Sequence, residues 1–193
     1  REWVFGRVDQ WLRAAAGGRT FLLVGGPGTG KSAILARLAQ FSLGRIAADG
    51  CPHLSANFLA YFHFCQAQQD ATLHPLRFVE ALSKALAARH EPFAKALLES
   101  AQDDRHITIN DTQSVGTAAD GSQVQNVVIQ NLNLGNLSAR VAFDRVVRRP
   151  LETLCRDGFH ESIVILVDSL DEARTWREEE SIVALLADTL DDP

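Results

Sequence analysis

The chain has 193 residues and a formal net charge of −5, with 46% hydrophobic and 22% charged residues. This length suits one globular domain with a sizeable core, and the acidic balance argues against a general nucleic-acid-binding surface. No apolar run approaches the ~20 residues that a membrane span needs, and three scattered cysteines do not make a disulfide framework, so we expect a cytoplasmic protein without membrane or direct nucleic-acid contacts.

The N-terminal stretch, residues 1–19, combines an aromatic box with a short helical pattern. The box is Trp3-Val4-Phe5-Gly6-Arg7. Apolar residues at helical spacing then predict a helix from about Val8 to Ala16, which Gly17-Gly18 would end. One interpretation is a capping helix that packs on the sheet; the other, a contact of the box with adenine, is taken up below.

Residues 20–41 hold the motif on which the functional prediction depends. An apolar run at Thr20–Val24 predicts a buried strand, and the apolar spacing of residues 31–41 predicts a helix. Between them, Gly25, Gly30, Lys31 and Ser32 fit the pattern G-x-x-x-x-G-K-[ST]. Glycines permit positive φ and leave no Cβ in the way, so backbone amides and the helix N-terminus could surround a phosphate. An ordinary glycine turn before a helix is the alternative.

The pattern predicts a binding site for ATP or ADP with Mg²⁺. Lys31 would reach the β- and γ-phosphates and act in catalysis, and the Ser32 hydroxyl would be a ligand of the metal. The remaining candidate nucleotide contacts come from the loop and the first helical turn: Gly26, Pro27, Gly28, Thr29, Gly30 and Ala33.

The stretch from residue 44 to residue 102 predicts scaffold elements. A nearly continuous apolar run at Phe58–Cys65 predicts a strand that is covered on both faces. Pro75 suits the first turn of a helix to about Arg89, and a shorter helix follows Pro92. Four potential zinc ligands lack the usual C-x₂₋₄-C spacing of a zinc site: Cys51, His53, His63 and Cys65.

Residues 107–135 change in composition to Asn, Gln, Ser, Thr and Gly with weak apolar alternation. They predict a β-hairpin or a partly ordered insertion at the edge of the sheet, with a turn at Ala119–Ser122. An unpaired strand there could dock another chain, although a plain surface insertion is the simpler interpretation.

A further helix is predicted from Asn136 or Ser138, either of which could cap it, to about Arg156. Pro150 would bend this helix. The pair Arg148-Arg149 could approach a phosphate of another chain, but such pairs are more often a solvated face.

The second half of the predicted site follows an apolar strand at Ile163–Val167. Asp168, at the end of a buried parallel strand, would hold Mg²⁺ opposite Ser32, as in a Walker B segment. Asp171 and Glu172 could orient or deprotonate the attacking water, and the sequence does not decide between them. Helix capping is the alternative for both acids.

Three motifs together resemble the NACHT branch of the STAND signalling ATPases: residues 3–7, Gly25–Ser32 and Asp168–Glu172. The Walker B segment of that family is Asp, a small residue, a hydrophobic residue and an acidic pair, which residues 168–172 match one by one. Residues 61–65 before a helix are also similar. The resemblance covers most of the chain except residues 107–135.

The resemblance implies an α/β, three-layer P-loop NTPase fold with a mainly parallel sheet. Residues 1–193 would be a partial NACHT nucleotide-binding domain, truncated after Walker B. Its parts would be an N-terminal box and helix at 1–19, a Walker A unit at 20–41, the β-hairpin insertion at 107–135 and Walker B at 162–172. The chain lacks methionine and continues for one predicted helix, at about Glu178–Leu190, so we expect a segment of a longer protein. In that family a sensor strand lies between the P-loop and Walker B strands, and its absence would leave the sheet gapped.

The resemblance also implies a slowly hydrolysing switch that is closed with ADP and self-associates with ATP, as in proteins of innate immunity, cell death and bacterial defence. A hydrophobic-Gly-Arg box contacts adenine in several ATPase families, which makes the backbone of Val4 and Phe5 a candidate for that contact. The alternatives are a P-loop kinase or other metabolic P-loop NTPase, and a nucleotide-binding module without turnover.

Overall fold

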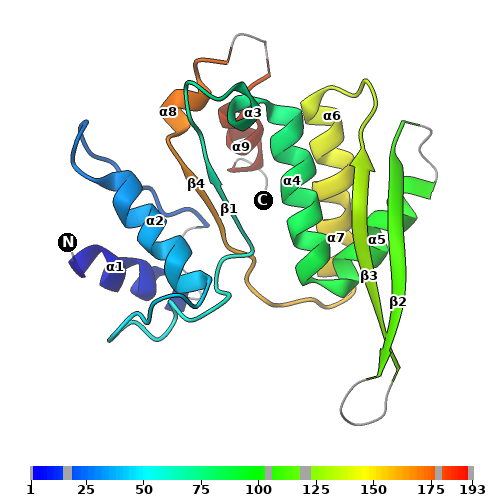
Figure 1. The fold of residues 1–193 in the computed structure, drawn as a ribbon, viewed down its shortest axis with the longest axis horizontal. Helices are drawn as coiled ribbons and strands as arrows, with labels where there is room; N and C mark the ends of the chain where they lie inside the picture. Colours follow the sequence, from blue (N-terminus) through cyan, green and yellow to red (C-terminus); the bar gives the residue numbers. More distant parts are fainter. Residues whose placement is uncertain (1, 15–18, 103–105, 118–122, 177–179, 191–193) are drawn as a thin grey trace.

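The computed structural model describes residues 2–14, 19–102, 106–117, 123–176 and 180–190. Its elements form two packed groups on either side of a short parallel strand pair (Figure 1). The expected stops and turns at Gly17-Gly18 and Ala119–Ser122 lie outside the described residues. Within the described part of the chain, no helix combines the length and the apolar character that a membrane crossing requires.

The N-terminal group consists of helices α1 (Glu2–Arg13) and α2 (Lys31–Ser42). Helix α1 begins earlier than the predicted start at Val8, because Val4 and Val8 lie one turn apart and are both buried in the same cluster as Ile34 and Leu38 of α2. The aromatic box therefore lies inside a helix rather than ahead of one.

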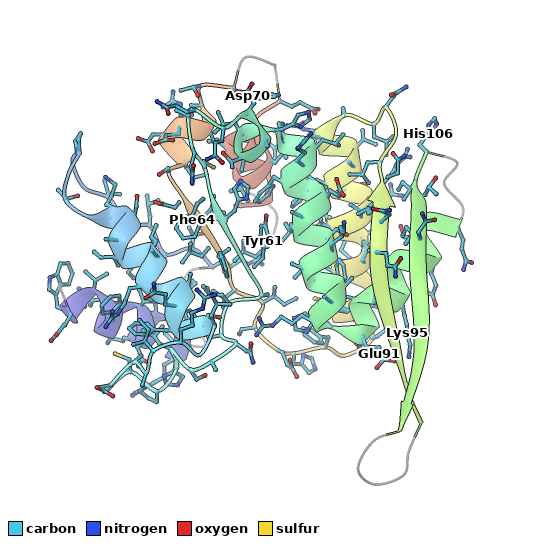
Figure 2. All side chains as sticks on the ribbon, in the orientation of Figure 1. Tyr61, Phe64, Asp70, Glu91, Lys95 and His106 are labelled. Atoms are coloured by element: carbon cyan, nitrogen blue, oxygen red, sulfur yellow. The ribbon has the colours of Figure 1, made fainter. Side chains whose placement is uncertain are left out.

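The parallel strand pair joins β1 (Tyr61–Phe64) to β4 (Ile165–Asp168). Tyr61 pairs with Ile165 and Phe64 pairs with Asp168, so both strands end at the same level. Figure 2 shows Tyr61 and Phe64 on opposite sides of β1, and Tyr61 packs on the helical core while Phe64 packs on the α1–α2 cluster. Both faces of the pair are thus covered, as the apolar runs predict.

The predicted buried strand at residues 20–24 is not formed, which corrects the sequence-based expectation. This segment has no regular secondary structure, and it pairs with neither β1 nor β4 in the part of the chain that the structure describes. Leu22 is 72% exposed and Val24 is 79% exposed. Apolar character alone could not supply the hydrogen-bonding neighbour that a strand requires.

The larger group is a helical layer around a core of aromatic and aliphatic side chains. Helix α4 (Pro75–Arg89) has the predicted bounds, and Phe78, Leu82 and Leu86 form its fully buried stripe. The other helices are α3 (Asp70–Leu73), α5 (Glu91–Gln102), α6 (Ala139–Phe143), α7 (Arg149–Arg156), α8 (Leu170–Ala173) and α9 (Ile182–Leu190).

Helices α6 and α7 are joined by a π-helical segment, η1 (Asp144–Arg148), which sequence patterns did not predict. Pro150 has no N–H to donate to the Val146 carbonyl four residues earlier. The buried Ser83 hydroxyl of α4 donates to that carbonyl at 2.8 Å instead. Ser138 caps α6, because its hydroxyl accepts a hydrogen bond from the Val141 N–H. It is one of the two residues predicted as the cap.

The antiparallel hairpin consists of β2 (Thr108–Thr117) and β3 (Gln123–Asn133), within the stretch where a hairpin was expected. The register shifts between Asn110 and Asp111, where Gln130 is the extra residue of β3. This bulge keeps Ile129 and Leu132 both buried although they are three positions apart. The hairpin packs on α4 and α5, and its turn end extends past those helices (Figure 1).

Candidate functional site

The glycine-rich loop between residues 25 and 30 forms a tight turn that opens directly into α2. Gly28 and Gly30 have φ of +73° and +80°, conformations that other residues rarely adopt. A Cβ on Gly25 would lie 2.9 Å from the Thr29 Oγ1, and this hydroxyl donates to the Gly26 carbonyl at 2.8 Å. The sequence-based interpretation of these glycines as conformational requirements is therefore confirmed at Gly28 and Gly30.

Lys31 is folded back over the loop that precedes it. Its Nζ donates hydrogen bonds to the Gly25 carbonyl at 2.7 Å and to the Gly26 carbonyl at 3.2 Å. The Lys31 ammonium is thus held beside the loop by two neutral carbonyl oxygens. An anionic ligand can take the place of these carbonyls as the acceptor, because its hydrogen bonds with the ammonium are charge-assisted and stronger.

The N-terminus of α2 presents backbone amides without a side-chain cap. Gly30 occupies the capping position and has no side chain, and the first amide of the turn that is bonded within the helix is that of Ile34, to the Gly30 carbonyl at 3.1 Å. Ser32 and Ala33 of this turn are exposed. A twelve-residue helix with an open first turn is a favourable position for an anion. The loop and these amides therefore fit a phosphate group.

The acidic half of the predicted site lies where β1 and β4 end together. Asp168 is 5% exposed, and its carbonyl accepts a hydrogen bond from the Cys65 N–H at 3.2 Å. The pKa of the Cys65 thiol is raised to about 11, first by burial and then by the carboxylates of Asp168, Glu172 and Asp171. The three predicted acids are therefore all close enough to act on one thiol.

Asp171 and Glu172, which the sequence left interchangeable, differ in their surroundings. Glu172 is half-buried and accepts a hydrogen bond from the Ala67 N–H, in the turn after β1. Asp171 is exposed. Both follow Ser169, whose φ of +56° turns the chain sharply after β4.

The glycine loop and the acidic strand end lie at the same end of the molecule. Helix α2 packs against β4 through Ile34, Leu38 and Leu166. In Figure 1 the N-terminal end of α2 and the C-terminal end of β4 both point toward the top of the view. The packing thus holds Ser32 and Asp168 on neighbouring elements that run in opposite directions.

The candidate adenine contacts lie in α1, and the arginine pair lies on an exposed face, as the simpler interpretation of that pair predicts. Val4 is 3% exposed inside α1, and the Phe5 ring packs edge-on against Phe41 with centroids 5.2 Å apart. Arg148 and Arg149 form ion pairs with the nearby Glu152 and Asp144, on the helical layer away from α2. An adenine contact by the backbone of Val4 or Phe5 stays a prediction.

Two of the histidines considered as zinc ligands, His63 and His53, have structural partners instead. His63 lies between the Tyr61 hydroxyl, 3.1 Å from Nδ1, and the Thr72 carbonyl, 2.7 Å from Nε2. His53 is bound to Asp9, whose charge also raises the pKa of Cys51 after burial does. No group of three or more His, Cys, Asp or Glu side chains in the described ranges could hold a metal ion.

Sequence reasoning considered Cys65 only as a potential zinc ligand, and it missed Ala67 in the turn after β1. The signal for Cys65 is its position directly after β1, because the ends of paired parallel strands lie side by side. Nothing in the sequence indicates the bond between Ala67 and Glu172, which are 105 positions apart.

The chain was compared with protein families, curated proteins and solved structures. The family model described as Nephrocystin 3, N-terminal matches residues 1–123. This range includes the glycine loop and β1, and it ends before Asp168, Asp171 and Glu172. No curated protein and no solved structure is similar enough to the chain to count as a match.

Proposed function

The chain belongs to the family of the nephrocystin 3 N-terminal domain, and from this membership and the geometry of the glycine loop we propose that it binds ATP or ADP with Mg²⁺ as a NACHT-type switch domain. The observation that carries the proposal is the open first turn of α2 with the Lys31 Nζ bonded to the Gly25 and Gly26 carbonyls. An anion at this point would accept hydrogen bonds both from the backbone amides of the first turn and from the Lys31 ammonium.

The proposed fold is a three-layer P-loop NTPase in which β1 and β4 belong to a mainly parallel sheet. The parallel register of these strands and the antiparallel packing of α2 on β4 support this proposal.

The binding half of the site would be built from the loop and the first turn of α2. The amides of Gly28 to Ala33 would surround the phosphates, and Lys31 would exchange its two carbonyl partners for β- and γ-phosphate oxygens. The Ser32 hydroxyl is exposed at the same turn and would bind the metal.

The catalytic half would be the acidic end of β4. Mg²⁺, when bound, would neutralise charge that develops on the phosphates. Asp168 would hold it through oxygen ligation, directly or through water. Asp171 and Glu172 would orient or deprotonate the attacking water, and the fixed position of Glu172 beside Ala67 suits it for orientation. Turnover would be slow, and the nucleotide would control self-association of a larger protein.

Thermal unfolding with and without nucleotide tests the proposal. At about 100 times its dissociation constant, Mg-ATP or Mg-ADP should stabilise the chain by about 2.7 kcal/mol. Lys31→Ala should abolish the shift and leave the melting of the free protein nearly unchanged, because its two bonds are exposed. Lys95→Ala, which removes a surface lysine paired with Glu91 at 2.7 Å, is the matched control and should keep the full shift. A wild-type chain without any shift would refute nucleotide binding.

A further inference from the structure

The loop that follows β1, residues 65–72, is closed on itself by the hydroxyl of Thr72. This hydroxyl accepts a hydrogen bond from the Gln66 N–H at 2.9 Å and donates one to the Gln69 carbonyl at 2.8 Å. The Gln69 N–H in turn donates to the Gln66 carbonyl at 2.9 Å. Residues 66–71 are exposed to solvent, so these three bonds rather than packing fix the course of the loop.

Thr72 is itself held in place from β1. The His63 Nε2 lies 2.7 Å from the Thr72 carbonyl oxygen, and because a carbonyl only accepts, this nitrogen carries a proton. The Tyr61 hydroxyl lies 3.1 Å from the other ring nitrogen, Nδ1. Both rings pack against the fully buried Phe78 of α4, with centroids 5.9 Å and 5.1 Å from it. The loop is therefore anchored to the helical core through Thr72.

The same loop holds one of the two candidate water-orienting acids. Ala67 directly follows Gln66, and its N–H donates to the Glu172 Oε2. Helices α3 and α8 lie together at the end of the strand pair where this bond forms (Figure 1). Among the described residues, the second carboxylate oxygen of Glu172 has no hydrogen-bond partner, so it can accept a hydrogen bond from water.

We propose that Thr72 is a positioning residue that regulates the proposed nucleotide site: by fixing the peptide that precedes Ala67, it holds Glu172 where that acid orients the attacking water. The inference rests on the proposed function, and it assigns the orienting role to Glu172 rather than to Asp171. The hydroxyl bonds of Thr72 are all within its own loop, so Thr72 sets the rate of hydrolysis and not the affinity for nucleotide. In a switch, this rate determines how long the ATP state lasts.

Removal of the hydroxyl tests the proposal. Thr72→Val keeps the branched shape of the side chain and should lower the kcat of ATP hydrolysis by about 10-fold or more, because a misplacement of about 1 Å can cost about 10²-fold. The KM and the thermal shift with Mg-ATP should not change. Thr72→Ser keeps the hydroxyl and should hydrolyse ATP at close to the wild-type rate. Ser83→Ala is the matched control, because it removes a hydroxyl that donates to a carbonyl at 2.8 Å in the helical core, and it should keep the wild-type kcat.

Two further measurements separate positioning from a general loss of structure. If Thr72 acts through the Glu172 carboxylate, Thr72→Val should not slow a Glu172→Gln variant any further, because the effects of residues that act as a unit do not add. Amide exchange followed by NMR should show faster exchange at Ala67 in Thr72→Val and unchanged exchange there in Ser83→Ala. This second measurement does not require turnover.

Several outcomes would overturn the proposal. They are a Thr72→Val variant with the wild-type kcat, a Thr72→Ser variant as slow as Thr72→Val, rate losses that multiply with Glu172→Gln, unchanged amide exchange at Ala67, and an equal loss of kcat in Ser83→Ala. A wild-type chain that shows the thermal shift but no hydrolysis would refute the role of Thr72 and leave nucleotide binding intact. A wild-type chain without any thermal shift would instead refute the proposed function itself, and the role of Thr72 with it.

Discussion

The Ala67 N–H donates a hydrogen bond to the Glu172 carboxylate. This bond links the turn after β1 to helix α8 after β4, so the two strand ends are joined by a side chain as well as by their parallel register. It also distinguishes the two adjacent acids, because the Glu172 carboxylate is fixed by this bond, whereas Asp171 is exposed.

The first prediction concerns the stability of the free protein. Glu172→Ala should lower the free energy of unfolding by about 1 kcal/mol, because the Ala67 amide loses its charged acceptor and is left to water. Asp171→Ala, one residue earlier and exposed, should change it by less than about 0.5 kcal/mol. Urea denaturation of the three proteins measures this difference. Equal losses for both variants would show that the Ala67 bond does not stabilise the fold.

The second prediction concerns turnover. Asp171→Asn and Glu172→Gln keep the shape of the side chains but remove their basicity, and loss of a general base commonly costs about 10²–10⁴-fold in rate. We expect at least one variant to lose ATP hydrolysis to this extent while nucleotide still raises the melting temperature. Phosphate release is the measurement. Wild-type rates in both variants would refute the catalytic assignment.

The third prediction concerns cysteine reactivity. Because burial and three carboxylates raise the pKa of Cys65 from 9.0 to about 11, its thiol should resist alkylation at pH 8, whereas the exposed Cys155 should react readily. Mass spectrometry of the alkylated peptides distinguishes the sites, and all three cysteines should react alike in urea.

The same pKa shift has a consequence for stability. Between pH 9 and 11 the unfolded chain releases the Cys65 proton and the folded chain retains it. The contribution of this thiol is therefore complete below pH 9 and declines as the pH rises toward 11. A Cys65→Ser variant should show a smaller loss of stability over this range than the wild type.

The fourth prediction concerns the turn after Asp168. Ser169 has φ of +56°, which is unfavourable for a residue with a Cβ. Ser169→Gly should be neutral or stabilise the protein by up to about 1 kcal/mol, and Ser169→Val should destabilise it by more than about 1 kcal/mol. Urea midpoints measure both. A destabilising glycine would mean that the Ser169 side chain has a stabilising role of its own.

The sequence predicted best where the determinants are local. The proline start and apolar stripe of Pro75–Arg89 gave the bounds of α4, and the hydroxyl of Ser138 is the expected cap. The predicted strand Ile163–Val167 overlaps β4, and Gly28 and Gly30 have the expected positive φ.

The sequence predicted least where the outcome depends on distant partners. Residues 20–24 are apolar enough for a strand, but pairing depends on a neighbour that local pattern does not specify. The π-helical segment depends on Ser83 of another helix, which supplies the hydrogen bond that Pro150 cannot. The bond between Ala67 and Glu172 depends on the two strands meeting in register. Each of these features is a property of tertiary packing.

Strand β4 has a different hydrophobic cluster on each face. Leu166 packs with α1 and α2, whereas Ile165 and Val167 pack on the helical core. A transient opening that releases α1 and α2 would uncover one face of the strand and leave the other covered. Amide protons of α1 and α2 should therefore exchange with deuterium while those of α4 and α5 are still protected. Bound nucleotide would slow amide exchange in α1 and α2 before it slows exchange in α4 and α5.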